Sequence, residues 1–114
     1  LYGYPDGLQS YIQVCEWAGK NLPDSSQIVC DKQPEAIAYG GKFIFVRLPN
    51  PLPRTADSIL TVFKDHRISH LLLSNSGGNV ANVAQFLYQT NPAILTQVHQ
   101  EGAAEPAYLF KINY

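Results

Sequence analysis

Six small or polar residues between two apolar segments form the best candidate for a binding site. They are Ser74, Asn75, Ser76, Gly77, Gly78 and Asn79. Glycines let backbone N–H groups face a ligand, and the first turn of a helix carries partial positive charge. The loop therefore predicts weak binding of an anion such as a phosphate or a sugar phosphate. Lys32, which follows a neighbouring strand, is expected to add positive charge.

A plain turn before a helix is the alternative interpretation of this loop. The segment lacks the Gly-x-Gly-x-x-Gly pattern and the lysine of a phosphate-binding loop. Ligands of open α/β sheets lie beyond the carboxyl ends of the strands, so the position of the loop still favours a site. The same edge is expected to carry Asp31 after the first strand and Arg47 late in the second.

No set of residues is spaced for catalysis or for metal binding. Ser74 and Ser76 follow a strand, as a hydrolase nucleophile does, but their neighbours do not match Gly-x-Ser-x-Gly. The nine acidic residues are scattered, and no pair is placed as general acid and base. His66 and His70 are four residues apart, with a change from helix to strand expected between them. We expect no catalytic residue, no cofactor and no metal ion.

A buried strand and a helix must position the loop. Residues 71–73 form a continuous apolar run, which is typical of a strand covered on both faces. After the loop, Val80, Val83, Ala84 and Leu87 repeat at helical spacing, and Asn79 is expected to cap this helix. One strand, one loop and one helix in this order are a step of an α/β sheet.

The other elements can be laid on either side of this unit. Apolar faces predict main helices over residues 6–22, after Thr55 and from residue 80, with a shorter helix over 34–39. Thr55 is expected to cap the second main helix. Further strands are expected at 27–30, 43–48, 95–100 and 107–112. The last two strands are joined by too few residues for a helix, so they predict an antiparallel hairpin.

The predicted fold is an α/β sandwich formed by residues 1–114 as a single domain. It has a mixed sheet of about five strands, with a parallel core and the C-terminal hairpin, and three main helices. The parallel strands are expected in the order 2-1-3, with residues 71–73 central and the hairpin at one edge.

Composition excludes some classes of partner. The formal net charge is −1, so no basic field is present for nucleic acid or anionic lipid. No apolar run approaches the ~20 residues of a membrane span. The chain has no methionine, which leads us to expect a processed protein or a piece of a longer one.

The two cysteines, Cys15 and Cys30, are expected in a helix and in the neighbouring strand. A disulfide between them would contribute about 3 kcal/mol in the chain-entropy model. Packed layers lie roughly 10 Å apart and a helix Cα lies about 2.3 Å from its axis, so the Cα–Cα distance would be near the upper limit for a disulfide. Two buried thiols are therefore predicted.

Several segments resemble one protein family when they are taken in order. They are Tyr11-Ile12-Gln13-Val14-Cys15-Glu16-Trp17, Lys20-Asn21-Leu22-Pro23-Asp24, Ile28-Val29-Cys30-Asp31-Lys32-Gln33-Pro34, Tyr39-Gly40-Gly41-Lys42, Arg67-Ile68-Ser69-His70-Leu71-Leu72-Leu73 and Tyr108-Leu109-Phe110-Lys111-Ile112. Together they resemble the C-terminal extracytoplasmic domain of polytopic membrane glycosyltransferases of the dolichyl-phosphate-mannose protein mannosyltransferase and aminoarabinose transferase type. The chain departs from that pattern at Asp31, which replaces a small polar residue, and by one inserted residue before Pro34.

The resemblance implies an accessory domain that does not itself transfer sugar. In that family the catalytic acid lies between transmembrane helices, and nothing in this chain corresponds to that loop. The implied partners are the transmembrane portion of the parent chain and a polyprenyl-phosphate-linked sugar donor or its acceptor. The implied location is the periplasmic face of the cytoplasmic membrane.

Two alternatives belong to other classes. The first is a free-standing α/β module that binds a ligand or a protein and is unrelated to glycosyl transfer. The second is a small hydrolase. Membrane spans encoded upstream in the same reading frame would favour the accessory domain.

Overall fold

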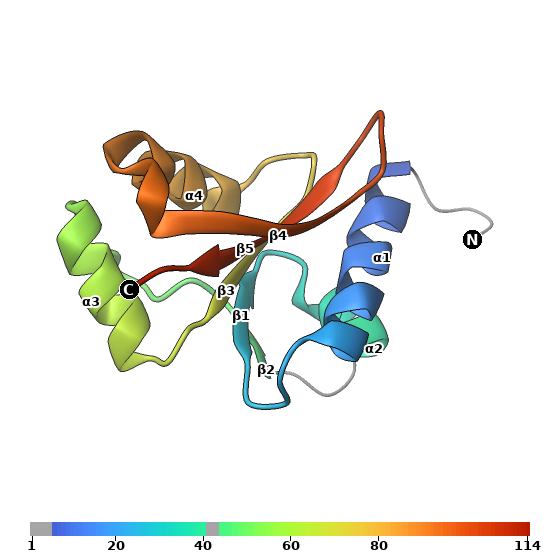
Figure 1. Ribbon diagram of the computed structural model, residues 1–114, viewed down its shortest axis with the longest axis horizontal. Helices are drawn as coiled ribbons and strands as arrows, with labels where there is room; N and C mark the ends of the chain where they lie inside the picture. Colours follow the sequence, from blue (N-terminus) through green and yellow to red (C-terminus); the bar gives the residue numbers. More distant parts are fainter. Residues whose placement is uncertain (1–5, 41–43) are drawn as a thin grey trace.

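Five strands form one mixed sheet that lies between two pairs of helices (Figure 1). The structure is a computed structural model, and it describes residues 6–40 and 44–114. Its elements, in chain order, are α1 (Asp6–Asn21), β1 (Gln27–Cys30), α2 (Gln33–Gly40), β2 (Ile44–Val46), α3 (Ala56–Asp65), β3 (His70–Leu73), α4 (Asn79–Thr90), the 3-10 helix η1 (Pro92–Ile94), β4 (Leu95–Glu101) and β5 (Ala107–Ile112).

The strand order is β2-β1-β3-β5-β4, so β3 is the central strand and β4 lies at an edge. β1 pairs in parallel with β2 and with β3, whereas β5 runs antiparallel to β3 and to β4. The predicted mixed sheet, the 2-1-3 order and the edge hairpin are confirmed. The predicted short helix is α2, which brings the number of α-helices in the described residues to four.

β2 is shorter than the predicted strand over 43–48, and residue 43 lies outside the described residues. Of the described residues in this segment, Ile44, Phe45 and Val46 pair with β1. Beyond Val46 the chain turns into a proline-rich segment, and proline has no N–H to donate to a sheet. This segment lies outside the sheet.

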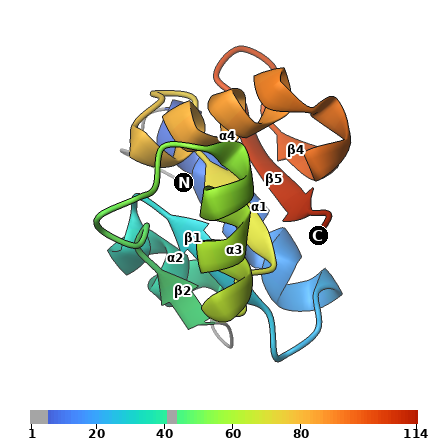
Figure 2. The same ribbon diagram turned by 90° about the vertical axis from the view of Figure 1, so that its left-hand side faces the viewer.

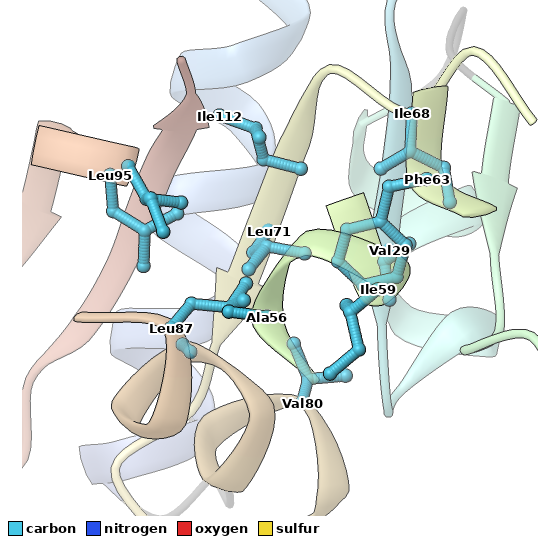
Figure 3. Packing of buried hydrophobic residues seen from close by; sticks show 12 residues of the cluster. Val29, Ala56, Ile59, Phe63, Ile68, Leu71, Val80, Leu87, Leu95 and Ile112 are labelled. Carbon is cyan, nitrogen blue, oxygen red and sulfur yellow. The ribbon is translucent and has the colours of Figure 1, made fainter. Parts of the chain in front are cut away.

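Alternate residues of the strands supply two separate cores. Ile28, Cys30 and Leu72 point to α1 and α2, whereas Val29 and Leu71 point to α3 and α4. Figure 2 shows α3 and α4 in front of the sheet. Figure 3 shows Val29 and Leu71 packed with Ile59 of α3 and Leu87 of α4. The period of two in a strand therefore makes β1 and β3 apolar on both sides.

The start of α3 follows from its local sequence. Thr55 caps α3 as predicted, and its Oγ1 accepts a hydrogen bond from the Ser58 N–H at 3.2 Å. No helix in the described ranges is long and apolar enough to cross a membrane.

The hairpin packs against α1 through aromatic and polar contacts. The rings of Trp17 and His99 are stacked, with centroids 4.1 Å apart. The hairpin turn has Gly102 at a φ of 87°, and a Cβ there would lie 2.1 Å from the Ser10 Oγ of α1. The positive φ and this close approach both require glycine. These contacts hold the hairpin against α1.

Both cysteines are buried thiols, as predicted. Burial raises the pKa of Cys15 to about 12 and that of Cys30 to about 11. A thiol must ionise to react, so neither side chain is a nucleophile in the folded chain.

We therefore predict that both thiols react with a disulfide reagent such as Ellman's reagent only when the chain unfolds. In native buffer near pH 8, modification should follow the rate of unfolding, and denaturant should release two equivalents at once. Rapid labelling of either cysteine in the native chain would contradict the buried positions.

His70 is a buried polar residue at the start of β3, with 7% of its surface exposed. Burial lowers the pKa of His70 to about 4, and the positive charge of Lys111 on β5 acts in the same direction. The Ser69 hydroxyl donates to the Gln27 carbonyl oxygen at 3.1 Å and lies 2.7 Å from His70 Nδ1. Both hydrogen bonds form when the neutral His70 ring carries its proton on Nδ1 and donates it to the Ser69 oxygen.

His70 should make the fold sensitive to mild acid. The unfolded chain binds a proton at this histidine near pH 6.5, whereas the folded chain binds it only near pH 4. Stability should fall by about 3 kcal/mol as the pH drops through this window. Urea unfolding between pH 7 and pH 4 measures this loss.

The histidine contribution is isolated by a pair of variants. His70→Gln should be less stable at pH 7 but should lose much less stability on acidification. His66→Gln, at an exposed position, should keep the slope of the parent chain. An unchanged slope in His70→Gln would show that other groups cause the acid sensitivity.

Candidate functional site

The parallel strands β1, β2 and β3 end at the same edge of the sheet, called here the carboxyl edge. After β1 the chain passes to α2 on one face, and after β3 it passes to α4 on the other. The two loops therefore diverge from adjacent strands, which opens a crevice at this edge. The candidate residues Asp31, Lys32 and Ser74–Asn79 all belong to these two loops.

A hollow of about 640 Å³ opens at the carboxyl edge. This is within the ~300–1,000 Å³ of small-molecule sites. Residues from β1, from the segment after β2 and from the first turns of α4 line this carboxyl-edge hollow, namely Cys30, Asp31, Arg47, Leu48, Pro49, Asn50, Leu52, Asn79, Asn82 and Val83. Sequence reasoning placed Asp31 and Arg47 at this edge and missed most of the others.

The start of α4 is held by a carboxylate from β1. Asp31 Oδ2 accepts a hydrogen bond from the Val80 N–H at 3.3 Å. This bond satisfies one of the unpaired N–H groups of the helix. The negative charge also interacts favourably with the partial positive charge at this end of the helix. Asp31 therefore occupies the kind of position in which an anionic ligand was expected.

The prediction that Asn79 caps α4 is wrong. Asn79 is the first residue of the helix, and the cap position belongs to Gly78, which makes no side-chain bond. Gly78 has a φ of 107°, and a Cβ there would lie 2.6 Å from Asp31 Oδ2. The carboxylate of Asp31 thus takes over the capping role, and this leaves room only for glycine beside it.

Lys32 lies on the opposite side of the chain from Asp31, because successive residues of an extended segment alternate in direction. Its Nζ is 5.7 Å from the centroid of the Tyr11 ring, and the Tyr11 hydroxyl donates to the Lys32 carbonyl oxygen at 3.2 Å. The ammonium group therefore contacts α1. The structure does not bring it to the Ser74–Asn79 loop.

The loop itself is closed by its own hydrogen bonds. The Gly77 N–H donates to the Ser74 carbonyl oxygen at 3.3 Å, and the Ser74 and Ser76 hydroxyls are 2.9 Å apart. Asn75 Nδ2 lies 3.5 Å from Glu105 Oε1 in the hairpin turn. Carboxylates thus lie on both sides of this loop, Asp31 at one end and Glu105 beside Asn75. Anion binding by the loop stays a prediction, and both charges oppose it.

The geometry provides recognition groups without a catalytic pair. Within residues 6–40 and 44–114, no three His, Cys, Asp or Glu side chains are grouped so that they could hold a metal ion. The Ser74 hydroxyl bonds to Ser76 and to the Gly77 carbonyl oxygen, and no described histidine bonds to it. What the carboxyl edge offers is a half-open hollow with amide, carboxylate and guanidinium groups at its rim.

The contact between Asp31 and α4 can be tested by stability. Gly78→Ala should cost about 2 kcal/mol, because the new methyl group meets the carboxylate and the backbone has a positive φ. Gly77→Ala is the matched control, since its φ is 80° and nothing lies within 4 Å of its Cβ position. It should cost about 1 kcal/mol. Urea unfolding gives both values.

A double-mutant cycle isolates the contact between the two side chains. In an Asp31→Ala background, Gly78→Ala should cost less than in the parent chain, because the opposing carboxylate is gone and only the backbone strain remains. Asp31→Ala alone should cost about 1 kcal/mol, as for the loss of a helix cap. Equal costs of Gly78→Ala in both backgrounds would contradict the contact.

The chain showed no match to any protein-family model, curated protein or solved structure with which it was compared.

Proposed function

We propose that this chain is a non-catalytic accessory domain of an integral-membrane glycosyltransferase that takes its sugar from a polyprenyl phosphate. In this proposal the domain lies on the periplasmic side of the membrane, joined to the transmembrane part of the same protein. Its carboxyl edge contributes to the surface that receives the lipid-linked donor or the acceptor. The transmembrane part carries out the transfer.

One observation carries the proposal, a ligand-sized hollow that has no catalytic pair beside it. The hollow has the volume and the polar rim of a recognition site. Its single carboxylate side chain, Asp31, is engaged with the backbone of α4. Glycoside chemistry uses a pair of carboxyl groups about 5–10 Å apart, and the rim does not supply a pair. The choice of family comes from the resemblance of the segments around Glu16-Trp17 and Ile28-Val29.

A free-standing α/β ligand-binding module is the second candidate. The same hollow favours it, because its volume lies in the range of small-molecule sites. The two candidates differ in their surroundings. The accessory domain requires about a dozen membrane spans of ~20 residues in the same reading frame, whereas the module requires none.

The first test is enzymatic. Residues 1–114 should not turn over a polyprenyl-phosphate-linked sugar or a nitrophenyl glycoside, because the described residues assemble no nucleophile or acid–base pair. Product release is measured by thin-layer chromatography for the lipid substrate and by absorbance for the glycoside. Turnover that is lost in Ser76→Ala or Asp31→Asn would make this chain an enzyme and would overturn the proposal.

The second test uses the intact parent protein in membranes. Asn79→Ala combined with Asn82→Ala should raise KM for the sugar substrate and leave kcat nearly unchanged, as expected for a loss of binding alone. Asn21→Ala, whose amide bonds to Trp17 on α1, is the matched control and should change neither constant. A reading frame without membrane spans would overturn the accessory role and leave the free-standing module.

A further inference from the structure

We infer that the carboxyl-edge hollow binds a neutral polyhydroxylated ligand, such as a sugar ring, and discriminates against anions. This inference goes beyond the proposed function. It concerns which molecules the hollow accepts, and it holds equally for an accessory domain and for a free-standing module.

Three carboxamide side chains at the rim provide the first argument. Asn50 lies in the segment after β2, and Asn79 and Asn82 lie in the first turns of α4, three residues apart and so on one side of the helix. Within residues 6–40 and 44–114 their side chains make no hydrogen bond, and all three residues are exposed. A carboxamide both donates and accepts, as a hydroxyl group does. The three groups thus match a ligand with several hydroxyls.

The charges at the rim provide the second argument. Asp31 brings a carboxylate, which accepts hydrogen bonds from hydroxyl groups and repels phosphate. Asp31 also accepts a hydrogen bond from the Val80 N–H. The partial positive charge at the start of α4 is therefore already compensated by a carboxylate of the same chain. Arg47 also lines the hollow, so its charged lining residues are one anion and one cation. The rim therefore carries no net positive field for an anion.

The apolar residues of the lining provide the third argument. Leu48, Leu52 and Val83 line the hollow, and each is half-buried. A sugar ring has hydroxyl groups at its edge and C–H groups on its faces, so a lining with both apolar and polar side chains suits it. A small inorganic ion would leave most of a hollow of about 640 Å³ unfilled.

The test is a titration of the ¹⁵N-labelled chain, followed by amide shifts in NMR spectra. The neutral probes are methyl α-D-mannoside and methyl β-D-glucoside, and the anionic probes are inorganic phosphate and glucose 1-phosphate. At least one glycoside should move the amides of Asn79, Asn82 and Val83 in a saturable way. Neither inorganic phosphate nor glucose 1-phosphate should shift these amides at the same concentration.

Variants test whether the amide shifts arise from binding to the side chains at the rim. Asn82→Ala should weaken glycoside binding about fivefold, which corresponds to one lost hydrogen bond. Asn21→Ala, remote from the hollow, is the matched control and should bind like the parent chain. Asp31→Asn keeps an acceptor oxygen for the Val80 N–H but removes the charge. It should retain glycoside binding and should gain measurable binding of phosphate.

Three results would overturn the inference. The first is phosphate binding by the parent chain that moves Gly77 and Gly78, which would assign the site to the loop. The second is a lack of response to both glycosides at a concentration of about 100 mM, well above the millimolar range of weak sites. The third is glycoside binding that survives Asn79→Ala together with Asn82→Ala. None of these results depends on membrane spans in the reading frame. The inference about the ligand and the proposed function can therefore fail independently of each other.

Discussion

The hydrogen bond from the Val80 N–H to the Asp31 carboxylate is the interaction on which the carboxyl edge depends. It joins the end of β1 to the start of α4, across the crevice that opens between β1 and β3. A helix terminus normally offers its unpaired N–H groups to solvent or to a ligand. Here one of those groups is taken by the chain itself. The same carboxylate dictates glycine at residue 78 and sets the charge of the hollow beside it.

Much of the fold could be predicted because its signals are local. The apolar run at 71–73 identified the central strand, and the short connection before residue 107 identified the hairpin. Thr55 was correctly predicted as a helix cap, since its bond is made within one turn. The order 2-1-3 of the parallel strands was expected without a local signal that dictates it, and the sheet has that order. Two buried thiols followed from the distance between packed layers.

The site was less predictable because its contacts join residues far apart in the sequence. The sequence around Asn79 favours that residue as a cap, yet Asp31, which lies 49 residues before Val80, provides the capping bond instead. Lys32 was expected near the loop, but alternation along the chain directs it to Tyr11. Asn50 and Asn82 meet at one hollow only through the path of the proline-rich segment after β2. The spacing of Asn79 and Asn82 on one helix face was the one signal that could have been read earlier.

The central claim is that the hollow beside Asp31 receives a neutral ligand with several hydroxyl groups. A crystal structure of the chain grown with methyl α-D-mannoside, or with methyl β-D-glucoside, tests it most directly. The account predicts a glycoside in the hollow, with hydroxyls bonded to Asn79 and Asn82 and a ring face on Leu52 or Val83, while Asp31 keeps its bond to Val80. A glycoside bound elsewhere, or an anion at Gly77 and Gly78 with Asp31 displaced, would contradict it.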